Sequence, residues 1–348
     1  MRLLIVTQAI DTQDPVLGFF HGWVAAIAAR MEQVTVICLK EGAHDFPANV
    51  RVYSLGKEKG GASAFAYAAR FLSLAWKLRH DYDRVFVHMN QEYILIAGWL
   101  WEILNKRVYM WRNHYAGSRL TDLAASTCTK VFCTSKHSYT AKYRKTVLMP
   151  VGIDLERFGT AGVADSEAAG VARVPDSILF FARMAPSKRP EMLIDALAQL
   201  RKKGIAFVAT FIGSPLPEDE AWYEKLKESA LPLGDAISFK PGIPNSEAPA
   251  AYRAHEISVN ASRSGMFDKT LFEAAACGCL VLATSDDFKG AAGTNQHFAD
   301  AAELAERLAE ALARSQEDRI HDRARMHALA RAQSLATLAD RLSVELSA

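Results

Sequence analysis

The sequence predicts an α/β protein with two doubly wound, Rossmann-like domains and a cleft between them. Three observations predict this class. Short apolar runs alternate with helical patterns from the first residues onward, as in parallel sheets with crossover helices. The alternation stops at a Pro- and Gly-containing stretch near residue 160 and then restarts. The length of 348 residues is about right for two domains.

The first half of the chain is expected to form one sheet with its crossover helices. Apolar runs predict strands at 3–6, 34–39, 50–55, 84–87, 108–111, 131–133 and 147–148. Helical patterns run from 18 to about 32, from 62 to 79 and from 93 to 104. Strands that are apolar throughout are typical of a parallel sheet covered on both faces.

The second half repeats this alternation. Strands are expected at 178–181, 207–212, 237–240, 256–260 and 280–283, and helices at 190–202, 218–229, 268–277, 300–314, 317–332 and 337–346. The small-residue stretch 159–170 has the composition of a linker. We therefore expect an N-terminal domain over 1–158 and a C-terminal domain over 159–334.

Composition excludes several classes of function. The net charge of +2 gives no electrostatic case for binding nucleic acid. The five cysteines follow no metal-ligand spacing, and we expect a reducing compartment. There is neither a signal-peptide pattern nor an apolar run near the ~18 residues of a spanning helix, so we expect a soluble, cytoplasmic protein. No G-x-G-x-x-G follows the first strand, which argues against a nicotinamide or flavin enzyme.

The helical pattern at 62–79 is apolar nearly all round and is followed by basic residues. A helix of this kind is usually buried, and we favour that interpretation. A face that lies on the inner surface of a membrane, as a lipid-linked acceptor would need, is the alternative.

The stretch 260–284 carries the strongest functional signal. A loop with Gly265 leads into a helix that ends at Gly278, and an apolar strand follows. Such a loop presents free N–H groups and the positive end of a helix dipole, which suits a phosphate. Thr270 and Glu273 have the spacing of a capping box, which predicts that Thr270 is the N-cap.

Three segments resemble motifs of one known family. Glu273-Ala-Ala-Ala-Cys-Gly278 is similar to the EAxAxG helix of the family 4 retaining glycosyltransferases, which have the GT-B fold. Val151–Phe158 resembles that family's NGVDxxxF segment, and Phe181–Lys188 resembles its GRLxxxK segment. The family has a glutamate eight residues before the EAxAxG glutamate, and this chain has Gly265 there.

The resemblance implies roles for individual residues. Arg183 and Lys188 would contact the diphosphate of a nucleotide sugar and stabilise it as leaving group, and Glu273 would accept from the two ribose hydroxyls. His114 would line the sugar pocket, and Gly18 would approach the diphosphate from the N-terminal domain. The remaining donor-binding candidates lie in the loop before the helix: Gly265, Met266, Phe267, Asp268 and Lys269. The family pattern does not include Asp268 and Lys269 and gives neither a role of its own, and Asp268 is an alternative N-cap of the helix. The resemblance also implies that the final helix, within 335–348, packs back onto the N-terminal domain.

Each of these residues also has an ordinary structural explanation. Arg183 and Lys188 could be solvated loop charges, and Glu273 could be the second member of the capping box. His114, and the lesser candidate His88, could be structural histidines at strand ends. Gly18 could be a common loop glycine. Because Glu273 and Asp154 stand where the family has them, we favour the functional interpretation for Arg183 and Lys188. For Glu273 the capping and ribose-binding interpretations are equally good, and the two are compatible.

We therefore expect a retaining glycosyltransferase that uses a nucleotide-diphosphate sugar and a glycan or lipid-linked acceptor. Electrostatic stabilisation by protein cations would carry most of the catalysis, so neither a metal nor another cofactor is expected. A GT-B sugar-nucleotide epimerase, a non-catalytic GT-B subunit that lacks the glutamate at Gly265, and a peripheral membrane scaffold remain the alternatives.

Overall fold

We analysed a computed structural model, which describes residues 1–14, 16–159, 173–265 and 269–348. The chain separates into two compact units. The first comprises Met1–Gly152, Gly265 and Leu335–Ala348, and the second comprises Ile153–Ser264 and 269–334, apart from the residues outside the described ranges. The division at Gly152 falls a few residues before the predicted one at 158, because Ile153 pairs with Ser334 in the second unit.

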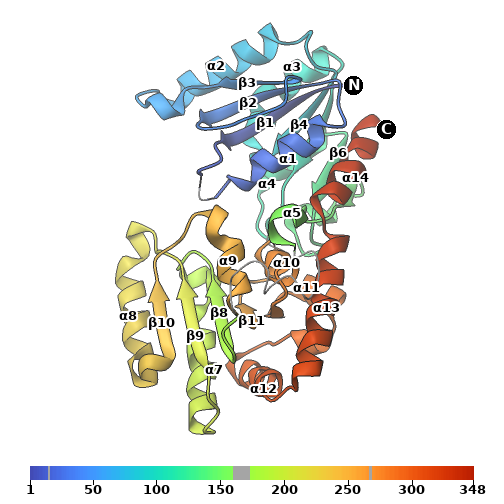
Figure 1. The fold of residues 1–348 in the computed structure, drawn as a ribbon. Coiled ribbons are helices and arrows are strands. Elements are labelled where there is room, and N and C mark those ends of the chain that lie inside the picture. Colours follow the sequence, from blue (N-terminus) through green and yellow to red (C-terminus); the bar gives the residue numbers. More distant parts are fainter. Residues whose placement is uncertain (15, 160–172, 266–268) are drawn as a thin grey trace. The chain divides into compact units, whose positions relative to one another are not determined.

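The first unit contains a seven-stranded sheet in which all neighbouring strands run parallel (Figure 1). Its order is β3-β2-β1-β4-β5-β6-β7. The strands are β1 (Arg2–Ile10), β2 (Gln33–Glu41), β3 (Val50–Ser54), β4 (Arg84–His88), β5 (Arg107–Trp111), β6 (Lys130–Cys133) and β7 (Thr146–Leu148).

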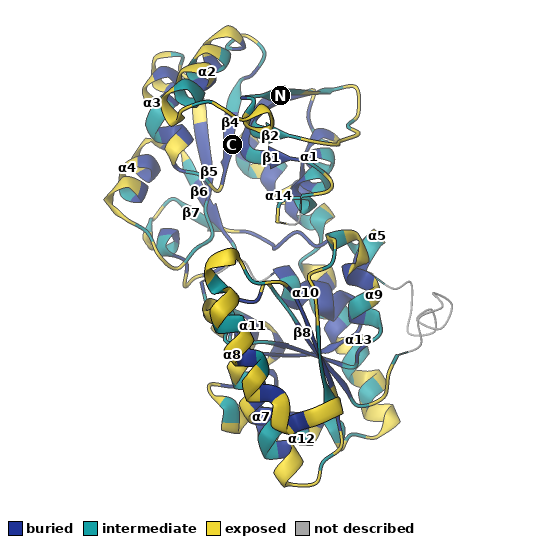
Figure 2. Cartoon of the chain, turned by 90° about the vertical axis from the view of Figure 1, so that its left-hand side faces the viewer, coloured by how far each residue is buried: buried dark blue, intermediate teal, exposed yellow. Residues whose placement is uncertain are grey.

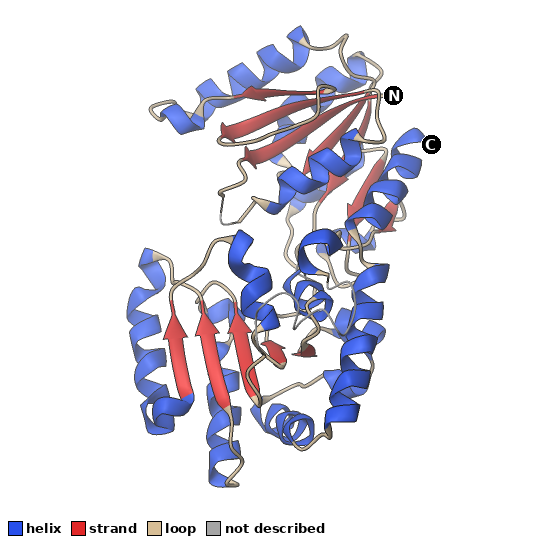
Figure 3. Cartoon of the chain, in the orientation of Figure 1, coloured by secondary structure: helices blue, strands red, loops and turns tan. Residues whose placement is uncertain are grey.

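Helices cover both faces of this sheet (Figure 3). Because side chains alternate along a strand, Leu3 and Ile5 of β1 face one way and Leu4 and Val6 the other. The first pair packs with α1 (Phe19–Ala28) and α14 (Leu335–Ser347), and the second with α2 (Ala64–Lys77), α3 (Glu92–Ile103) and α4 (Arg119–Thr127). Both faces are therefore buried, which explains why the strands read as continuous apolar runs.

The last helix, α14, is part of the first unit. Leu338, Leu342 and Leu346 are buried in the same cluster as Trp23 of α1. Arg30 Nε donates to Asp340 Oδ1 at 2.6 Å, and the Tyr109 hydroxyl donates to the Leu346 carbonyl at 3.2 Å. These contacts connect the end of the chain to its first helix and to β5.

The structure corrects the prediction for α2. Only Phe71 and Ala75 of this helix are buried, whereas Phe65 and Trp76 are exposed. Figure 2 shows most of α2 in the colours of exposed and intermediate residues. The sequence has apolar residues on all sides of this helix, but the sheet and α3 cover only one side of it. None of the described helices combines the length and the apolar character that a membrane-spanning helix requires.

The second unit contains a five-stranded parallel sheet in the order β10-β9-β8-β11-β12. Its strands are β8 (Ser177–Phe181), β9 (Val208–Ile212), β10 (Ile237–Lys240), β11 (Ile257–Asn260) and β12 (Leu280–Ala283). Its helices are α5 (Leu155–Phe158), α7 (Pro190–Lys202), α8 (Glu220–Ala230), α9 (Ala248–Arg253), α10 (Lys269–Ala276), α11 (Asp286–Ala292), α12 (Ala301–Leu312) and α13 (Gln316–Ala332).

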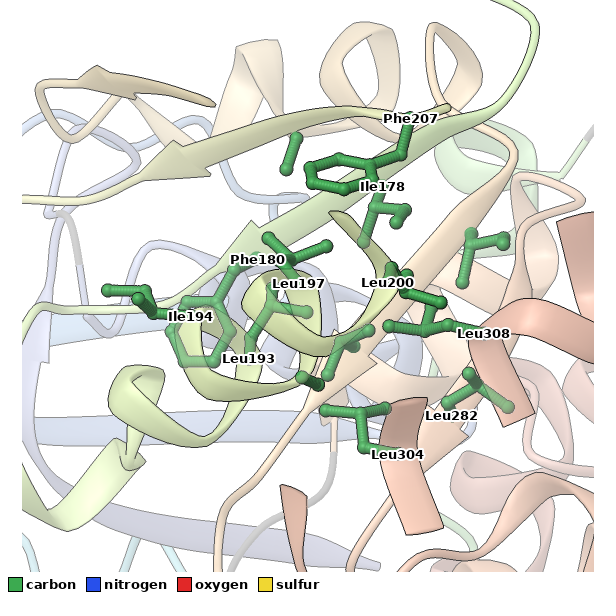
Figure 4. Close-up of a cluster of buried hydrophobic side chains, with 14 of the residues drawn as sticks. Ile178, Phe180, Leu193, Ile194, Leu197, Leu200, Phe207, Leu282, Leu304 and Leu308 are labelled. Carbon is green, nitrogen blue, oxygen red and sulfur yellow. The ribbon is translucent and has the colours of Figure 1, made fainter. Parts of the chain in front are cut away.

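One large apolar cluster holds α7 and α12 against this sheet (Figure 4). Leu193, Leu197 and Leu200 of α7 point toward Ile178 and Phe180 of β8, and all five are buried. Leu304 and Leu308 of α12 complete the cluster beside Leu282. This core fixes the positions of the strand ends from which the candidate site is built.

The sequence patterns missed the helices α4, α5, α9 and α11, of which α5 is a single turn of four residues. Helices α9 and α11 span less than about two turns, too few for a 3.6-residue period to emerge, and α4 is rich in Thr and Ser. The other predicted helices are present, with most ends shifted by a few residues. The predicted linker at 159–170 lies, apart from Gly159, outside the described residues.

The core predicts a clear contrast between two leucine substitutions. Leu197→Ala removes a side chain that is fully buried between α7 and β8, so unfolding free energy should fall by about 2–5 kcal/mol. Leu231→Ala removes an exposed side chain and should change it by less than about 0.5 kcal/mol. Urea unfolding of both variants measures the difference, and equal losses would contradict this packing.

Candidate functional site

The candidate site lies at the carboxyl ends of β8, β11 and β12, which are neighbours in the second sheet. In an open parallel sheet, the loops at this edge form the usual ligand-binding region. After β8 the chain passes through Arg183 and a short 3₁₀ turn, Pro186–Lys188, into α7. After β11 it leads through Ser262 and Ser264 into α10, and after β12 through Thr284 into α11.

The two predicted cations differ in their surroundings. Arg183 is exposed, and its side chain has no hydrogen-bond or ion-pair partner among the described residues. Lys188 is half-buried, and its Nζ lies 3.3 Å from the Oγ of the buried Ser262. Lys188 is thereby held beside the loop after β11, whereas the guanidinium of Arg183 is available for a ligand.

Arg189 has a structural role at the same edge, although it was not among the predicted site residues. It takes a left-handed backbone conformation between the 3₁₀ turn and α7. Its Nε donates to the Ala261 carbonyl at 2.6 Å and its Nη2 to the Thr284 hydroxyl at 2.9 Å. Burial, together with the nearby positive charge of Arg263, lowers the pKa of Arg189. This one side chain joins the loops that follow three adjacent strands.

A chain of hydrogen bonds connects Lys188 with the start of α10. The Ser262 amide donates to Asn260 Oδ1 at 2.8 Å, and Asn260 Nδ2 donates to the Thr270 hydroxyl at 3.1 Å. The Thr284 hydroxyl in turn donates to the Ser262 carbonyl at 2.7 Å. The start of the loop after β11, at Ser262, is therefore fixed on both sides. The Asn-x-Ser pattern at the strand end was a sequence signal for this turn.

The structure changes the predicted start of α10. The helix includes Lys269, so Thr270 lies in the first turn and the prediction that it is the N-cap is wrong. The Glu273 carboxylate is bound instead by the ammonium group of Lys269, one turn earlier. Both side chains are buried, with Lys269 8% and Glu273 2% exposed. The spacing of four residues places the two on one face of the helix, which makes the pair possible.

Aromatic side chains surround this ion pair. The ammonium group of Lys269 lies 5.4 Å from the centre of the Phe158 ring, at the end of α5. Tyr252 of α9 is fully buried, and its hydroxyl has no hydrogen-bond partner in the part of the chain that the structure describes. Burial, with a smaller contribution from the negative charge of Glu273, raises the pKa of Tyr252 well above its usual value. The start of α10 thus combines a buried ion pair with an unsatisfied hydroxyl.

Gly265, which stands where the resembled family has a glutamate, has a positive φ of 83°. An L-residue is strained in this conformation, so the backbone explains the glycine. Met266, Phe267 and Asp268, the other loop residues predicted to bind the donor, lie outside the described residues.

The remaining predicted residues, His114 and Gly18, belong to the first unit. His114 follows β5 and is half-buried against Tyr115, with ring centres 4.5 Å apart. Its Nδ1 accepts from the Ala116 amide at 2.9 Å, which places the proton on Nε2 in the neutral ring. Gly18 stands at the N-cap of α1, and a Cβ there would lie 2.7 Å from the Asp14 carbonyl oxygen.

His88, the lesser candidate, is a core residue. It is fully buried, and its ring stacks on Phe20 with centres 3.8 Å apart. Its Nδ1 lies 3.2 Å from the Thr7 hydroxyl. Burial lowers the pKa of His88 to about 3, so the ring is neutral at physiological pH. A position at a strand end made His88 a candidate, but its environment is that of a structural histidine.

One small cavity lies away from this edge of the sheet. A cavity of about 20 Å³ is lined by arginines at the amino ends of β11 and β12, and Arg319 and Arg314 there pair with Glu256 and Asp322. It is therefore separate from the predicted site.

Across the described ranges, no three His, Cys, Asp or Glu side chains are grouped in a way that could hold a metal ion.

Comparison with known proteins places the strongest similarity in the second half of the chain. Residues 166–334 match the model of the family described as glycosyl transferases group 1. The D-inositol 3-phosphate glycosyltransferase of Frankia alni is 33% identical over 143 residues, which is 38% of this chain and 35% of that protein. The enzyme of the same name from Streptomyces bingchenggensis is 35% identical over 143 residues, covering 38% and 31%. The chain thus matches about a third of the length of these relatives.

Solved structures resemble the whole chain. Anabaena HepE in complex with UDP has a TM-score of 0.76 at 19% identity, and both chains are covered completely. Sucrose-phosphate synthase from Thermosynechococcus elongatus has a TM-score of 0.77 at 16% identity, with 100% of this chain and 98% of that chain covered. These similarities show the fold, which consists of two parallel-sheet α/β domains as in GT-B proteins.

Because Arg189 joins the loops after three strands, replacing it is predicted to reduce the stability of the fold rather than ligand binding. Arg189→Met removes hydrogen bonds from a charged donor to the loops after β11 and β12, so unfolding free energy should fall by about 1.5–3 kcal/mol. Arg183→Met, at an exposed position, should change it by less than about 0.5 kcal/mol. Chemical denaturation compares the two, and equal stabilities would contradict the role of Arg189.

Proposed function

We propose that this protein is a retaining glycosyltransferase of family 4 that transfers a sugar from a nucleotide-diphosphate sugar to a glycan or lipid-linked acceptor. The observation that carries this proposal is the grouping at the carboxyl edge of the second sheet. There Arg183, Lys188 and Glu273 stand in the segment that matches glycosyl transferases group 1. The binding of UDP and of UDP-glucose by HepE, a protein of the same fold, supports a nucleotide-sugar donor.

The chemistry follows from the charges of these side chains. Breaking the bond between sugar and phosphate places negative charge on the leaving diphosphate. The guanidinium of Arg183 and the ammonium of Lys188 would neutralise this charge as it develops, which lowers the barrier. These cations would do the work of a divalent metal, so the proposed reaction requires none. In a reaction on one face of the sugar, the leaving phosphate itself takes the proton of the acceptor hydroxyl.

The other residues would orient the donor. The Glu273 carboxylate would accept from the ribose hydroxyls, and His114 would donate from its protonated Nε2 to the sugar. Neither forms a covalent bond in this scheme. Removal of either should therefore weaken donor binding or misplace the sugar.

A panel of UDP-, GDP-, ADP- and CMP-sugars tests the proposal. The expected result is binding of one nucleotide class in calorimetry and slow transfer of the labelled sugar to water or an acceptor. Interconversion of two nucleotide sugars would indicate an epimerase instead. Binding without turnover would indicate a non-catalytic subunit, and no binding of any compound would contradict the proposal.

The diphosphate-binding role predicts the effect of removing each cation. Arg183→Ala and Lys188→Ala should each weaken binding of the nucleoside diphosphate by about 1.5–3 kcal/mol if each side chain makes one charged hydrogen bond. Arg201→Ala, at the end of α7, provides a matched control with unchanged affinity. Calorimetric titration measures the effect, and unchanged affinity in both site variants would show that these cations do not bind the diphosphate.

The surface of the first unit supports a lipid-linked acceptor. Helices α2 and α3 contact each other and expose large apolar side chains: Phe65, Trp76, Trp99 and Ile103. Arg79 lies over the Trp76 ring at 4.3 Å, and Lys77 is exposed beside it. Exposed tryptophans with basic neighbours are typical of a surface that contacts anionic lipids.

This acceptor proposal predicts binding to vesicles that contain anionic phospholipid. Replacing both Trp76 and Trp99 by Ser should reduce co-sedimentation several-fold, because it removes apolar area that would insert between headgroups. Leu231→Ser, at an exposed position of the second unit, should leave co-sedimentation unchanged. Equal sedimentation of all three proteins would argue for a soluble glycan as acceptor.

A further inference from the structure

The Lys269–Glu273 ion pair at the start of α10 is buried, which the spacing of the two residues in the sequence did not predict. A Lys–Glu pair four residues apart is common on exposed helix surfaces, where it contributes little. Here both side chains are buried, and the Lys269 ammonium lies over the Phe158 ring as well as against Glu273. Burial of two charges is costly unless each satisfies the other, so neither charge is tolerated alone.

The pair does not satisfy Glu273 completely. Lys269 binds the Oε1 atom, whereas Oε2 has no hydrogen-bond partner among the described residues. The buried hydroxyl of Tyr252, close enough to feel the charge of Glu273, also has none. A buried hydroxyl without a partner, such as that of Tyr252, is rare in folded proteins and is often completed by water or a ligand. One oxygen of Glu273 is thus fixed and the other is open.

Other charges near α10 do not replace Lys269. The strands β11 and β12, which contact this helix, carry no titratable side chain. Besides Lys269 and Glu273 themselves, the titratable groups on α10 and on the other elements packed against it are Asp154, Glu156 and Arg157 around α5, Tyr252 and Arg253 of α9, Cys277, and Glu317, Asp318, Arg319, His321, Asp322, Arg323, Arg325, His327 and Arg331 of α13. Arg323 and His327 lie near Gly278, beyond the opposite end of the helix. Among all of these described groups, none forms an ion pair with Glu273.

We infer that Lys269 is a positioning residue of the proposed donor site, which holds the buried Glu273 carboxylate ionised and oriented so that its open oxygen can accept from a ribose hydroxyl. The inference rests on the proposed function. It assigns a role to a residue that the family resemblance left without one. Without Lys269, a buried Glu273 would take up a proton, and a protonated carboxyl is a poorer acceptor.

A ligand-free experiment tests the first half of the inference. In Lys269→Met the folded-state pKa of Glu273 should rise above its unfolded value. The stability of the variant is then retained at low pH and lost as pH rises through that raised pKa. The melting temperature of Lys269→Met should therefore fall further below that of the wild type between about pH 5 and about pH 8.5. The double variant Lys269→Met/Glu273→Gln has no buried charge, and the gap between its melting temperature and that of the wild type should not change with pH.

A binding experiment tests the second half, with UDP-glucose as the probe because its diphosphate does not titrate in this range. Wild-type affinity should be nearly constant with pH. Lys269→Met should bind about tenfold or more weakly near pH 6 and recover toward pH 8.5, since one unit of pKa corresponds to a factor of about ten. Lys269→Arg retains the charge and should restore the wild-type profile. Lys202→Met, an exposed lysine of α7, provides the matched control.

The possible outcomes are distinct. A Lys269→Met variant that melts and binds like the wild type at every pH overturns the inference. A pH-independent loss of affinity, equally large in the double variant and in Lys269→Met, also overturns it, because Lys269 would then contact the nucleotide directly. If the wild type does not bind UDP-glucose, the proposed function fails for this donor. The melting series in the absence of ligand still decides whether Lys269 controls the ionisation of Glu273.

Discussion

The parallel direction of every described strand pair is the constraint on which the rest of the structure depends. Parallel strands need a crossover after each strand, and all carboxyl ends of one sheet meet along a single edge. In the second unit this brings together Lys188, Ser262 and Thr284, which are far apart in the sequence. Arg189 then joins the three loops by hydrogen bonds, so the candidate site is supported by the same edge that the sheet order creates.

The sequence predicted the strands well because buried parallel strands are apolar without interruption, and such runs are visible in a single sequence. It also predicted the end of α10, since Gly278 has a left-handed backbone with φ of 80°. It could not predict how far α2 is buried, because periodicity does not say which neighbours a helix has. The helices α9 and α11 were missed because they are too short to establish a period.

The candidate site shows a similar limit. Thr270 and Glu273 have the spacing of a capping box, and Lys269 and Glu273 have the spacing of a helical ion pair. The two patterns compete for one carboxylate, and the helix start decides between them: because α10 includes Lys269, the ion pair forms. Local spacing thus identified Glu273 as important but gave the wrong partner. Because the pair is buried, each charge depends on the other. This burial involves Phe158 and Tyr252, which come from other parts of the chain.

The five cysteines have a practical consequence. All five are buried, and burial raises the pKa of Cys38 and of Cys128 to about 12 and that of Cys279 to about 11. Because the thiolate is the reactive form, these side chains should hardly react with maleimides near neutral pH. The natural protein therefore needs no cysteine removal before spectroscopic labelling. A cysteine introduced at the exposed Phe65 and another at the exposed Leu231 would carry one probe on each unit, and the distance between the probes would report domain motion in solution.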